Sequence, residues 1–159
     1  MNLHSPILLA TDGSPSAGEA QQQAFDLAKL SGAPLLVVSV SHTTLPAVGY
    51  SAYGYSNVVS ELTHAEHKRL DALLAGVTEA AAKEGIECTT VEADGAIVEE
   101  ISRIAAEHRA QLVVVGSHGW GAARRFLSGS VSTGLVHSAP CPVLVVRATD
   151  GAQRRVVAA

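Results

Sequence analysis

Glycine and serine residues in the last third of the chain are spaced in a way that could hold an anion. Gly116-Ser117-His118-Gly119 is followed, after nine residues, by Gly129-Ser130-Val131-Ser132. Glycine lets the main chain approach a ligand closely or adopt a positive φ. A helix beginning near Gly129 would offer unpaired N–H groups and a partial positive charge, which favour phosphate. The residues alone leave two readings open, a phosphate site or a loop whose glycines make turns and whose serines cap a helix.

A second polar segment, Ala10-Thr11-Asp12-Gly13-Ser14, follows the first apolar run of the chain. The carboxylate of Asp12 could accept hydrogen bonds from a ribose hydroxyl or an adenine amine. Alternatively, Asp12 or Ser14 serves only as the N-cap of the next helix. The residues do not decide between these two roles.

Several other chemistries lack the residues that they need. The chain has no Gly-x4-Gly-Lys-Ser/Thr loop and no Gly-x-Ser-x-Gly turn, and it has no lysine after Lys83. Gly119-Trp120-Gly121 opens a dinucleotide fingerprint, but Arg124 stands where the third glycine would be. His64 and His67 lie on neighbouring turns of a predicted helix without a cysteine partner, so a solvated helix face explains them better than a metal site.

Continuous apolar runs indicate the strands that must position these segments. Runs that are apolar at every position suit strands buried on both faces, as in a parallel sheet. A weaker run at 86–91 carries Cys88 and two threonines, which predicts a less buried edge strand. The four strong runs are 7–10, 35–38, 112–115 and 143–146.

Helical patterns fill the intervals between the runs. The first helix starts either at Ser14-Pro15 or at a Ser16-to-Glu19 capping box, and Gly32 ends it. A longer helix is predicted from about Glu61 to Glu84, with Gly85 after it. A third helix is lined by Ile97, Ile101, Ile104 and Ala105, and a fourth begins near Ser130 and stops before Pro140.

Strands that alternate with helices in this way predict an α/β fold with right-handed crossovers. We expect one doubly wound five-stranded parallel sheet of order 3-2-1-4-5, with helices on both faces. The domain should span residues 1–147, and residues 148–159 should form a C-terminal tail. Ligands of such sheets bind at the carboxyl ends of the strands, so the loops after Ala10, Val40, Val91 and Val115 are the candidate site.

Composition narrows the class of protein further. The chain has 159 residues, of which 47% are hydrophobic, and its formal net charge is −4. The charge argues against nucleic acid as the main partner, and the apolar runs are too short to span a membrane. Two cysteines and an N-terminus without a signal-peptide pattern predict a cytoplasmic protein with reduced thiols.

Taken together, these motifs resemble the universal stress protein family over residues 5–147. The resemblance is carried by Gly-x2-Gly-x9-Gly-Ser after a valine-rich run, and by the Pro-Cys-Pro-Val-Leu-Val-Val that follows. The opening Ile-Leu-Leu-Ala-Thr-Asp-Gly-Ser and the pair Asp94-Gly95 before the third helix also match.

The resemblance implies ATP binding and assigns roles to several residues. In ATP-binding members the residue matching Asp12 contacts the nucleoside, and the main chain at Val40 reads the adenine. The glycines matching Gly116 and Gly119 line the ribose and the phosphates, and Mg²⁺ can bridge the phosphates. Gly129, Ser130, Val131 and Ser132 would cradle the phosphates. The predicted site therefore comprises Ala10, Thr11, Asp12, Val40, Val115, Gly116, Gly119, Gly129, Ser130, Val131 and Ser132.

The function expected is that of a nucleotide-binding stress-response regulator. A slow ATPase or an adenine-nucleotide transferase, and a dimerisation module that binds AMP or cyclic AMP, are the alternatives. An apolar last strand at a sheet edge favours a homodimer formed by antiparallel pairing of Val143, Leu144, Val145 and Val146 with their copies, as the resemblance also implies. The tyrosine-rich segment 43–57 is expected to be a loop, either a mobile lid or an excursion without contacts, and Trp120 has no assigned role.

Overall fold

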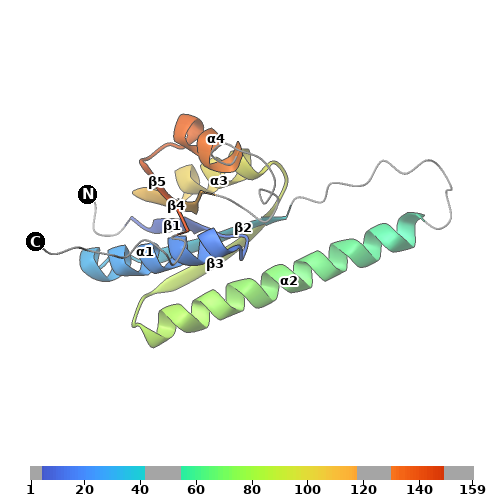
Figure 1. Cartoon of the computed structure of the whole chain (residues 1–159), viewed down its shortest axis with the longest axis horizontal. Helices are drawn as coiled ribbons and strands as arrows, with labels where there is room; N and C mark the ends of the chain where they lie inside the picture. Colours follow the sequence, from blue (N-terminus) through green and yellow to red (C-terminus); the bar gives the residue numbers. More distant parts are fainter. Residues whose placement is uncertain (1–4, 42–54, 118–129, 149–159) are drawn as a thin grey trace, which may run out of the picture.

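The protein is built on a five-stranded parallel sheet whose strand order is β3-β2-β1-β4-β5 (Figure 1). The computed structural model describes residues 5–41, 55–117 and 130–148. This architecture confirms the predicted fold class and strand order, whereas the division into residues 1–147 and 148–159 stays a prediction. The strands are β1 (Ile7–Ala10), β2 (Leu35–Ser41), β3 (Cys88–Asp94), β4 (Leu112–Gly116) and β5 (Val143–Val146).

Two pairs of helices cover the two faces of the sheet. On one face α1 (Pro15–Ser31) and α2 (Tyr55–Lys83) pack against Leu9, Val37 and other inward residues. On the other face α3 (Ile97–Glu107) and α4 (Ser130–Ser138) pack against a second buried cluster. Because successive strand residues point to opposite faces, both faces of β1 and β2 are apolar, as their uninterrupted runs predict.

Local signals fix the ends of α1. The hydroxyl of Ser14 accepts a hydrogen bond from the Ala17 N–H at 3.3 Å, and Pro15 occupies the first turn, where its missing N–H is no loss. Gly32 ends the helix in the left-handed conformation, with φ of 68°. Of the two predicted starts, Ser14-Pro15 is therefore the one used.

The second helix begins earlier than predicted, at Tyr55 rather than near Glu61. The prediction was wrong because the residues from 55 to 60 include serine, asparagine and valine, which are weak helix formers. A helix that is already nucleated gains one hydrogen bond with each residue added, so it can extend through such a segment. The predicted loop at 43–57 is thus wrong at 55–57, which belong to α2, and its residues 43–54 lie outside the described residues.

The third strand begins later than the predicted run at 86–91, because a turn at the end of α2 includes Gly85 and Ile86. Gly85 has φ of 71° and its N–H bonds to the Ala82 carbonyl, while the Ile86 N–H bonds to the Ala81 carbonyl at 2.9 Å. This is a Schellman ending, so Ile86 packs under the helix end and the strand begins only at Cys88. The prediction that this is an edge strand is confirmed.

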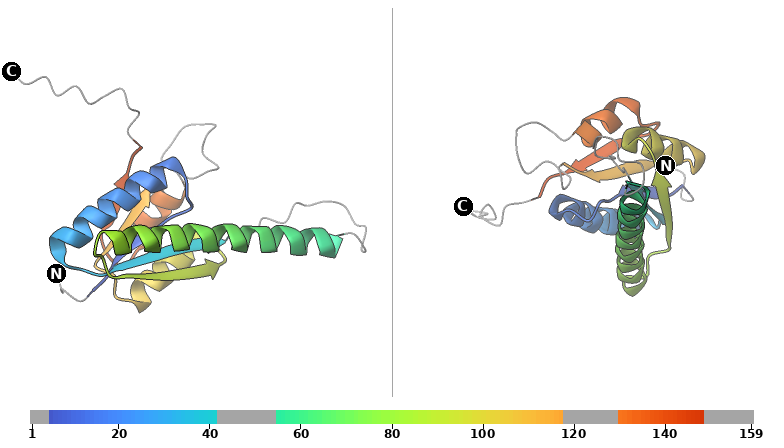
Figure 2. Two further views of the ribbon diagram at one scale, coloured as in Figure 1. Left: turned by 90° about the horizontal axis from the view of Figure 1, so that it is seen from below. Right: turned by 90° about the vertical axis from the view of Figure 1, so that its right-hand side faces the viewer.

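The length of α2 sets it apart from the sheet that it covers. Its 29 residues span about 44 Å at the rise of an α-helix, whereas the seven residues of β3 span about 23 Å. Figure 2 shows α2 running beside β3 and continuing well beyond its arrowhead, at the end of the sheet where the strands terminate. The N-terminal turns of α2 therefore extend beyond the sheet.

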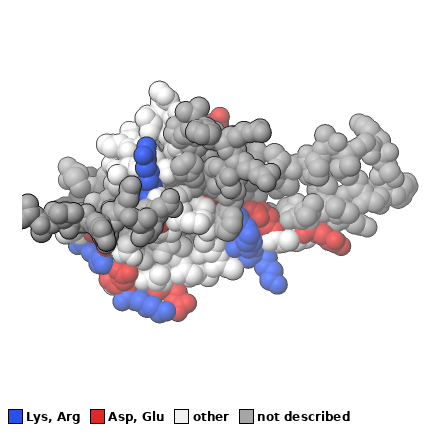
Figure 3. All heavy atoms as spheres, in the orientation of Figure 1, with Lys and Arg blue, Asp and Glu red and all other residues white. Residues whose placement is uncertain are grey.

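Charged side chains on the described surface are interspersed in sign. Figure 3 shows Lys and Arg beside Asp and Glu along the lower edge of that view, the side on which α2 lies. The pairs include Lys29 with Glu84 at 2.6 Å and Lys83 with Glu79 at 2.8 Å. Exposed pairs of this kind contribute little to stability. Among the described helices, none combines the length and the apolar character required to cross a bilayer.

Candidate functional site

A pocket opens at the carboxyl ends of β1, β2 and β4. Its empty volume is about 520 Å³, including space open to solvent. The walls come from those strand ends, from the start of α1, and from α3 and α4. The lining residues are Ala10, Thr11, Asp12, Ser14, Ala17, Val38, Val40, Ile97, Ile101, Val115, Gly116 and Val131.

The structure brings together most of the predicted site that it describes. Of the predicted residues, those that line the pocket are Ala10, Thr11, Asp12, Val40, Val115, Gly116 and Val131. Ser132 is buried in the first turn of α4 without being one of the lining residues. Ser130 is the first residue of α4, and Gly119 and Gly129 lie outside the described residues. The ligand roles of all these residues stay predictions.

Five lining residues were not predicted as part of the site. Ser14 and Ala17 belong to the start of α1, and Val38 lies in β2. Ile97 and Ile101 were recognised only as the apolar stripe of the third helix. The apolar stripe could have indicated that they line the site. A helix that packs on the sheet near the carboxyl ends of the strands also borders a pocket at those ends.

Two kinds of surface meet in the pocket. One wall is aliphatic, made by Val38, Val40 and Val115 from the strands and by Ile97, Ile101 and Val131 from the helices. The rim after β1 is polar. An apolar slot with a few polar groups at one end suits a flat heterocycle that carries a polar substituent.

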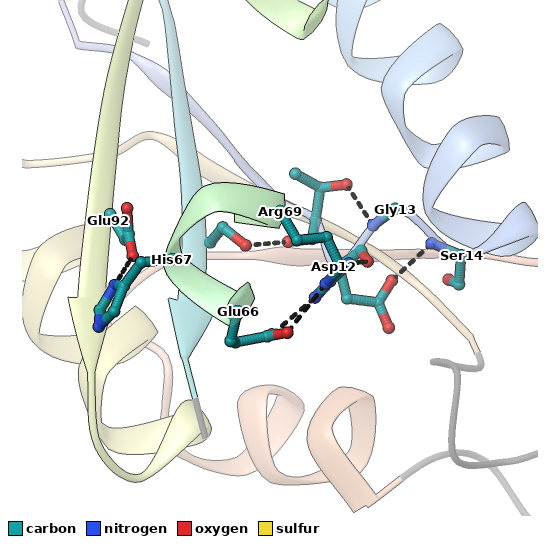
Figure 4. Close-up of polar contacts among 9 residues, drawn as sticks. Asp12, Gly13, Ser14, Glu66, His67, Arg69 and Glu92 are labelled. Carbon is teal, nitrogen blue, oxygen red and sulfur yellow. Dashed lines mark hydrogen bonds and ion pairs between the residues drawn. The ribbon is translucent and has the colours of Figure 1, made fainter. Parts of the chain in front are cut away.

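The loop after β1 presents Asp12 in a fixed local conformation (Figure 4). The Ser14 N–H donates to Asp12 Oδ1 at 2.9 Å, and the Gly13 N–H donates to Thr11 Oγ1 at 3.3 Å. Gly13 itself has φ of 77°, a conformation that glycine adopts without strain. Since Ser14 is the N-cap of α1, the carboxylate of Asp12 is not the helix cap but closes a turn at the pocket.

The main chain of Val40 also faces the site. In β2 the Val38 carbonyl accepts from the Thr11 N–H on the β1 side, and the Ser41 carbonyl accepts from the Gly95 N–H on the opposite side. Peptide groups alternate in direction along a strand, so those of Val40 point to the same side as those of Val38. There β1 has already ended at Ala10, and Val40 lines the pocket that begins beyond it.

Gly116 has a structural role that its motif does not reveal. A Cβ atom at this position would lie 2.6 Å from Ser16 Oγ, 2.8 Å from the Ser16 carbonyl carbon and 2.9 Å from the Ala17 nitrogen. The end of β4 therefore needs glycine to approach the first turn of α1. A larger side chain here would displace α1 whether or not a ligand is bound.

The first turn of α4 borders the pocket through Val131. The N-terminus of a helix carries partial positive charge, and its unpaired N–H groups can donate hydrogen bonds to an anion. This is where the sequence predicts the phosphate cradle, although its glycines at 119 and 129 are not described.

The two histidines of α2, His64 and His67, lie in different surroundings. Within the described residues, no group of three or more histidine, cysteine, aspartate or glutamate side chains is arranged to hold a metal ion. His64 is exposed, as expected. His67 instead donates through Nδ1 to Glu92 of β3, and its Nε2 lies 3.9 Å from Asp94 Oδ1. The hydrogen bond to Glu92 raises the pKa of His67 above its ordinary value of 6.5, with Asp94 and Asp71 adding to the attraction.

Two solved structures with the same fold hold adenine nucleotides. One is a universal stress protein in complex with cAMP, which is 23% identical, with a TM-score of 0.66 over 92% of this chain and 98% of that one. The other is a universal stress protein family member from Arabidopsis thaliana with AMP bound, which is 18% identical, with a TM-score of 0.65 over 92% and 93% of the two chains. At these identities the likeness shows the fold.

Relatives of higher identity give the same family. A universal stress protein of Methanocaldococcus jannaschii is 34% identical over 146 residues, which cover 92% of this chain and 84% of that protein. UspA from Lactobacillus plantarum, a solved structure, has a TM-score of 0.79 and 26% identity over 91% and 98% of the two chains. The model of the universal stress protein family matches residues 4–147. With that match and those relatives, the chain belongs to the universal stress protein family.

Proposed function

We propose that this protein binds an adenine nucleotide, ATP or a nucleotide with fewer phosphates, in the pocket at the carboxyl ends of β1, β2 and β4. Binding would regulate the protein's conformation or its choice of partner. The observation that carries the proposal is the pocket itself, which joins an aliphatic slot, a fixed carboxylate and a helix N-terminus in one place. The nucleotides held by the cAMP-bound and AMP-bound family structures support the same ligand class.

The base would occupy the aliphatic part of the pocket. Ile97, Ile101 and Val131 approach it from the helices, opposite Val38 and Val40 of the sheet. The N–H and C=O of Val40, which point beyond the end of β1, are suited to pair with one edge of adenine. Flat aliphatic walls select for a planar base, and main-chain groups select for its pattern of donors and acceptors.

The sugar and the phosphates would follow along the rim. The Asp12 carboxylate is an acceptor suited to ribose hydroxyls, and it is held ready by the Ser14 N–H. The phosphates would then lie toward the N-terminus of α4, with Gly119, Gly129 and Ser130 completing the cradle. A Mg²⁺ ion that bridges the phosphates stays a prediction.

A regulatory role is proposed in preference to an enzymatic one. Phosphoryl transfer needs charge neutralisation and an oriented nucleophile. Among the described lining residues Asp12 is the one carboxylate, and the lining includes neither lysine nor arginine. Slow hydrolysis or nucleotidyl transfer would need groups other than these described lining residues.

We also propose that the protein forms a homodimer through β5. On the β4 side the Pro142 carbonyl accepts from the Val113 N–H, and the Val146 carbonyl accepts from the Ser117 N–H. By alternation, the peptide groups of Val143 and Val145 point outward from the edge of the sheet. A short apolar edge with outward donors and acceptors is a template for pairing with a second copy.

Calorimetry on matched variants of α4 tests the nucleotide site. Val131 lines the pocket, whereas Val136 on the same helix is 59% exposed. Val131→Phe should fill the base slot and weaken binding of adenosine, AMP, cAMP and ATP by about tenfold or more. Val136→Phe introduces the same side chain on the outer face and should leave affinity unchanged.

Two outcomes would contradict the proposal. The first is a parent protein that binds none of these ligands at millimolar concentration while remaining folded by circular dichroism. The second is a Val131→Phe variant that binds as tightly as the parent, because the ligand would then lie elsewhere.

A further inference from the structure

Arg69 of α2 reaches from the helix to the loop that carries Asp12 (Figure 4). Its Nη1 donates to the main-chain oxygen of Asp12 at 3.1 Å. Its Nε and Nη2 donate to the two carboxylate oxygens of Glu66, at 3.0 and 2.8 Å. The guanidinium thus forms a bidentate ion pair with Glu66 on its own helix, while Nη1 bonds to the loop.

We propose that Arg69 is a positioning residue for the nucleotide site, fixing the Asp12–Gly13 peptide so that the Asp12 carboxylate keeps its orientation toward the ligand. This inference rests on the proposed function. It adds to that function a residue that is not among those lining the pocket and that no motif in the sequence marks.

Thr11, at the start of the loop, is tied to β2: its N–H donates to the Val38 carbonyl at 2.9 Å, and its carbonyl accepts from Ser39 Oγ at 2.8 Å. The bonds from Gly13 to Thr11 and from Ser14 to Asp12 each join residues two apart. These two bonds shape the turn between Thr11 and Ser14. The bond from Arg69 spans 57 residues and connects the turn to another element.

Packing beside Arg69 strengthens this connection. A Cβ atom at Gly13 would lie 3.3 Å from Leu73 Cδ1 and 3.9 Å from Arg69 Nη1. One turn of α2, from Arg69 to Leu73, therefore packs against the loop at Gly13. Glycine loses more conformational freedom on folding than any other residue. Contacts that restrain Gly13 therefore help to keep the turn in one conformation.

Direct binding of phosphate by Arg69 fits the geometry less well. The fork of its guanidinium is already engaged by Glu66, which neutralises its charge. Arg69 is also absent from the residues that line the pocket. Its effect on a ligand should therefore pass through Asp12 and depend on the nucleoside rather than on the number of phosphates.

The test compares Arg69→Met with Arg103→Met. Arg103 of α3 forms the same kind of pair, with Glu100 at 2.7 Å and Glu107 at 2.6 Å, and its side chain is 50% exposed against 46% for Arg69. Arg69→Met should weaken binding of adenosine, AMP and ATP by the same factor, about three- to tenfold, as expected for loss of one ordering hydrogen bond. Arg103→Met should bind all three ligands as the parent does.

Three further measurements make the result decisive. Amide exchange at Gly13 and Ser14 should accelerate in Arg69→Met and not in Arg103→Met. Glu66→Gln, which loosens the fork while leaving Arg69 in place, should have a smaller effect of the same kind. The effect of Arg69→Met should persist at high salt, because it does not arise from long-range attraction.

Unchanged affinity in Arg69→Met, with the parent binding normally, would overturn the positioning role. A loss that grows from adenosine to ATP and shrinks with salt would also overturn it, in favour of direct attraction of phosphate. If the parent binds no nucleotide, the proposed function fails instead. Amide exchange at Gly13 still reports in that case whether Arg69 orders the loop.

Discussion

At position 116 the main chain of β4 passes so close to α1 that a side chain has no room. Gly116→Ala would place its Cβ within 2.9 Å of main-chain and side-chain atoms of Ser16 and Ala17. Relieving that overlap requires a backbone shift, so we expect the free energy of unfolding to fall by about 1–3 kcal/mol. Urea denaturation followed by circular dichroism measures the change.

Gly76→Ala is the matched control, since a Cβ at Gly76 would meet no atom within 4 Å. Alanine in an exposed helix interior should raise the free energy of unfolding by about 0.5–1 kcal/mol. A Gly116→Ala variant as stable as the parent would mean that the strand and helix are looser than the structure describes.

Single residues divide into those that the sequence could identify and those that it could not. Asp12 and Val131 were predicted because each stands in a contiguous motif next to a strand or a helix start. Arg69 was not, because an exposed arginine three residues after a glutamate is an ordinary helix-surface pair. Its contact with the Asp12 carbonyl depends on how α2 docks, which no local pattern encodes.

Among the elements, α2 and β3 are joined by a histidine whose charge depends on pH. The hydrogen bond to Glu92 raises the pKa of His67, so the protonated form is favoured in the folded state. The resulting stabilisation is fully present below the unfolded pKa, near 6.5, and is lost as pH rises through the higher folded value. Stability of the parent should therefore exceed that of His67→Gln most at low pH.

Denaturation midpoints of the parent and His67→Gln, compared from about pH 5.5 to 8.5, measure this difference. His64→Gln, one turn away at an exposed position, is the matched control for replacing a histidine on α2. A gap between parent and His67→Gln that widens with pH would contradict the assigned sign.

Element boundaries were predictable where a single residue type determines them. Gly32 and Gly85 end α1 and α2 in the left-handed conformation, and both ends were predicted. The start of α2 and the register of β3 were not, because helix extension through weak formers and the burial of Ile86 under a helix end depend on neighbouring elements. The βαβ alternation and the preferred hand of the crossovers predicted the parallel sheet, and the expected strand order is confirmed.

For the molecule as a whole, the outer edge of β5 decides the oligomeric state. Val145→Pro removes an outward N–H while leaving the bonds to β4 in place, and proline is tolerated on an edge strand. The parent should sediment as a dimer at micromolar concentration and Val145→Pro as a monomer. Val145→Ala, which shortens the side chain and keeps the N–H, should remain dimeric.

A parent protein that sediments as a monomer at those concentrations would refute the β5 dimer. If both variants stayed dimeric, pairing through this edge would be excluded and another surface would have to hold the two copies together.

The overhang of α2 has a geometric consequence for the region around the pocket. Tyr55 lies about 21 Å along the helix from Arg69, the residue that grips the Asp12 loop. If α2 pivoted about the contact between Arg69 and Asp12, a tilt of the helix by about 5° would move Tyr55 by about 2 Å. A small rearrangement of the Asp12–Gly13 peptide beside a bound ligand would thus produce a larger displacement at the N-terminus of α2. A partner protein that contacts this end of the helix could respond to that displacement.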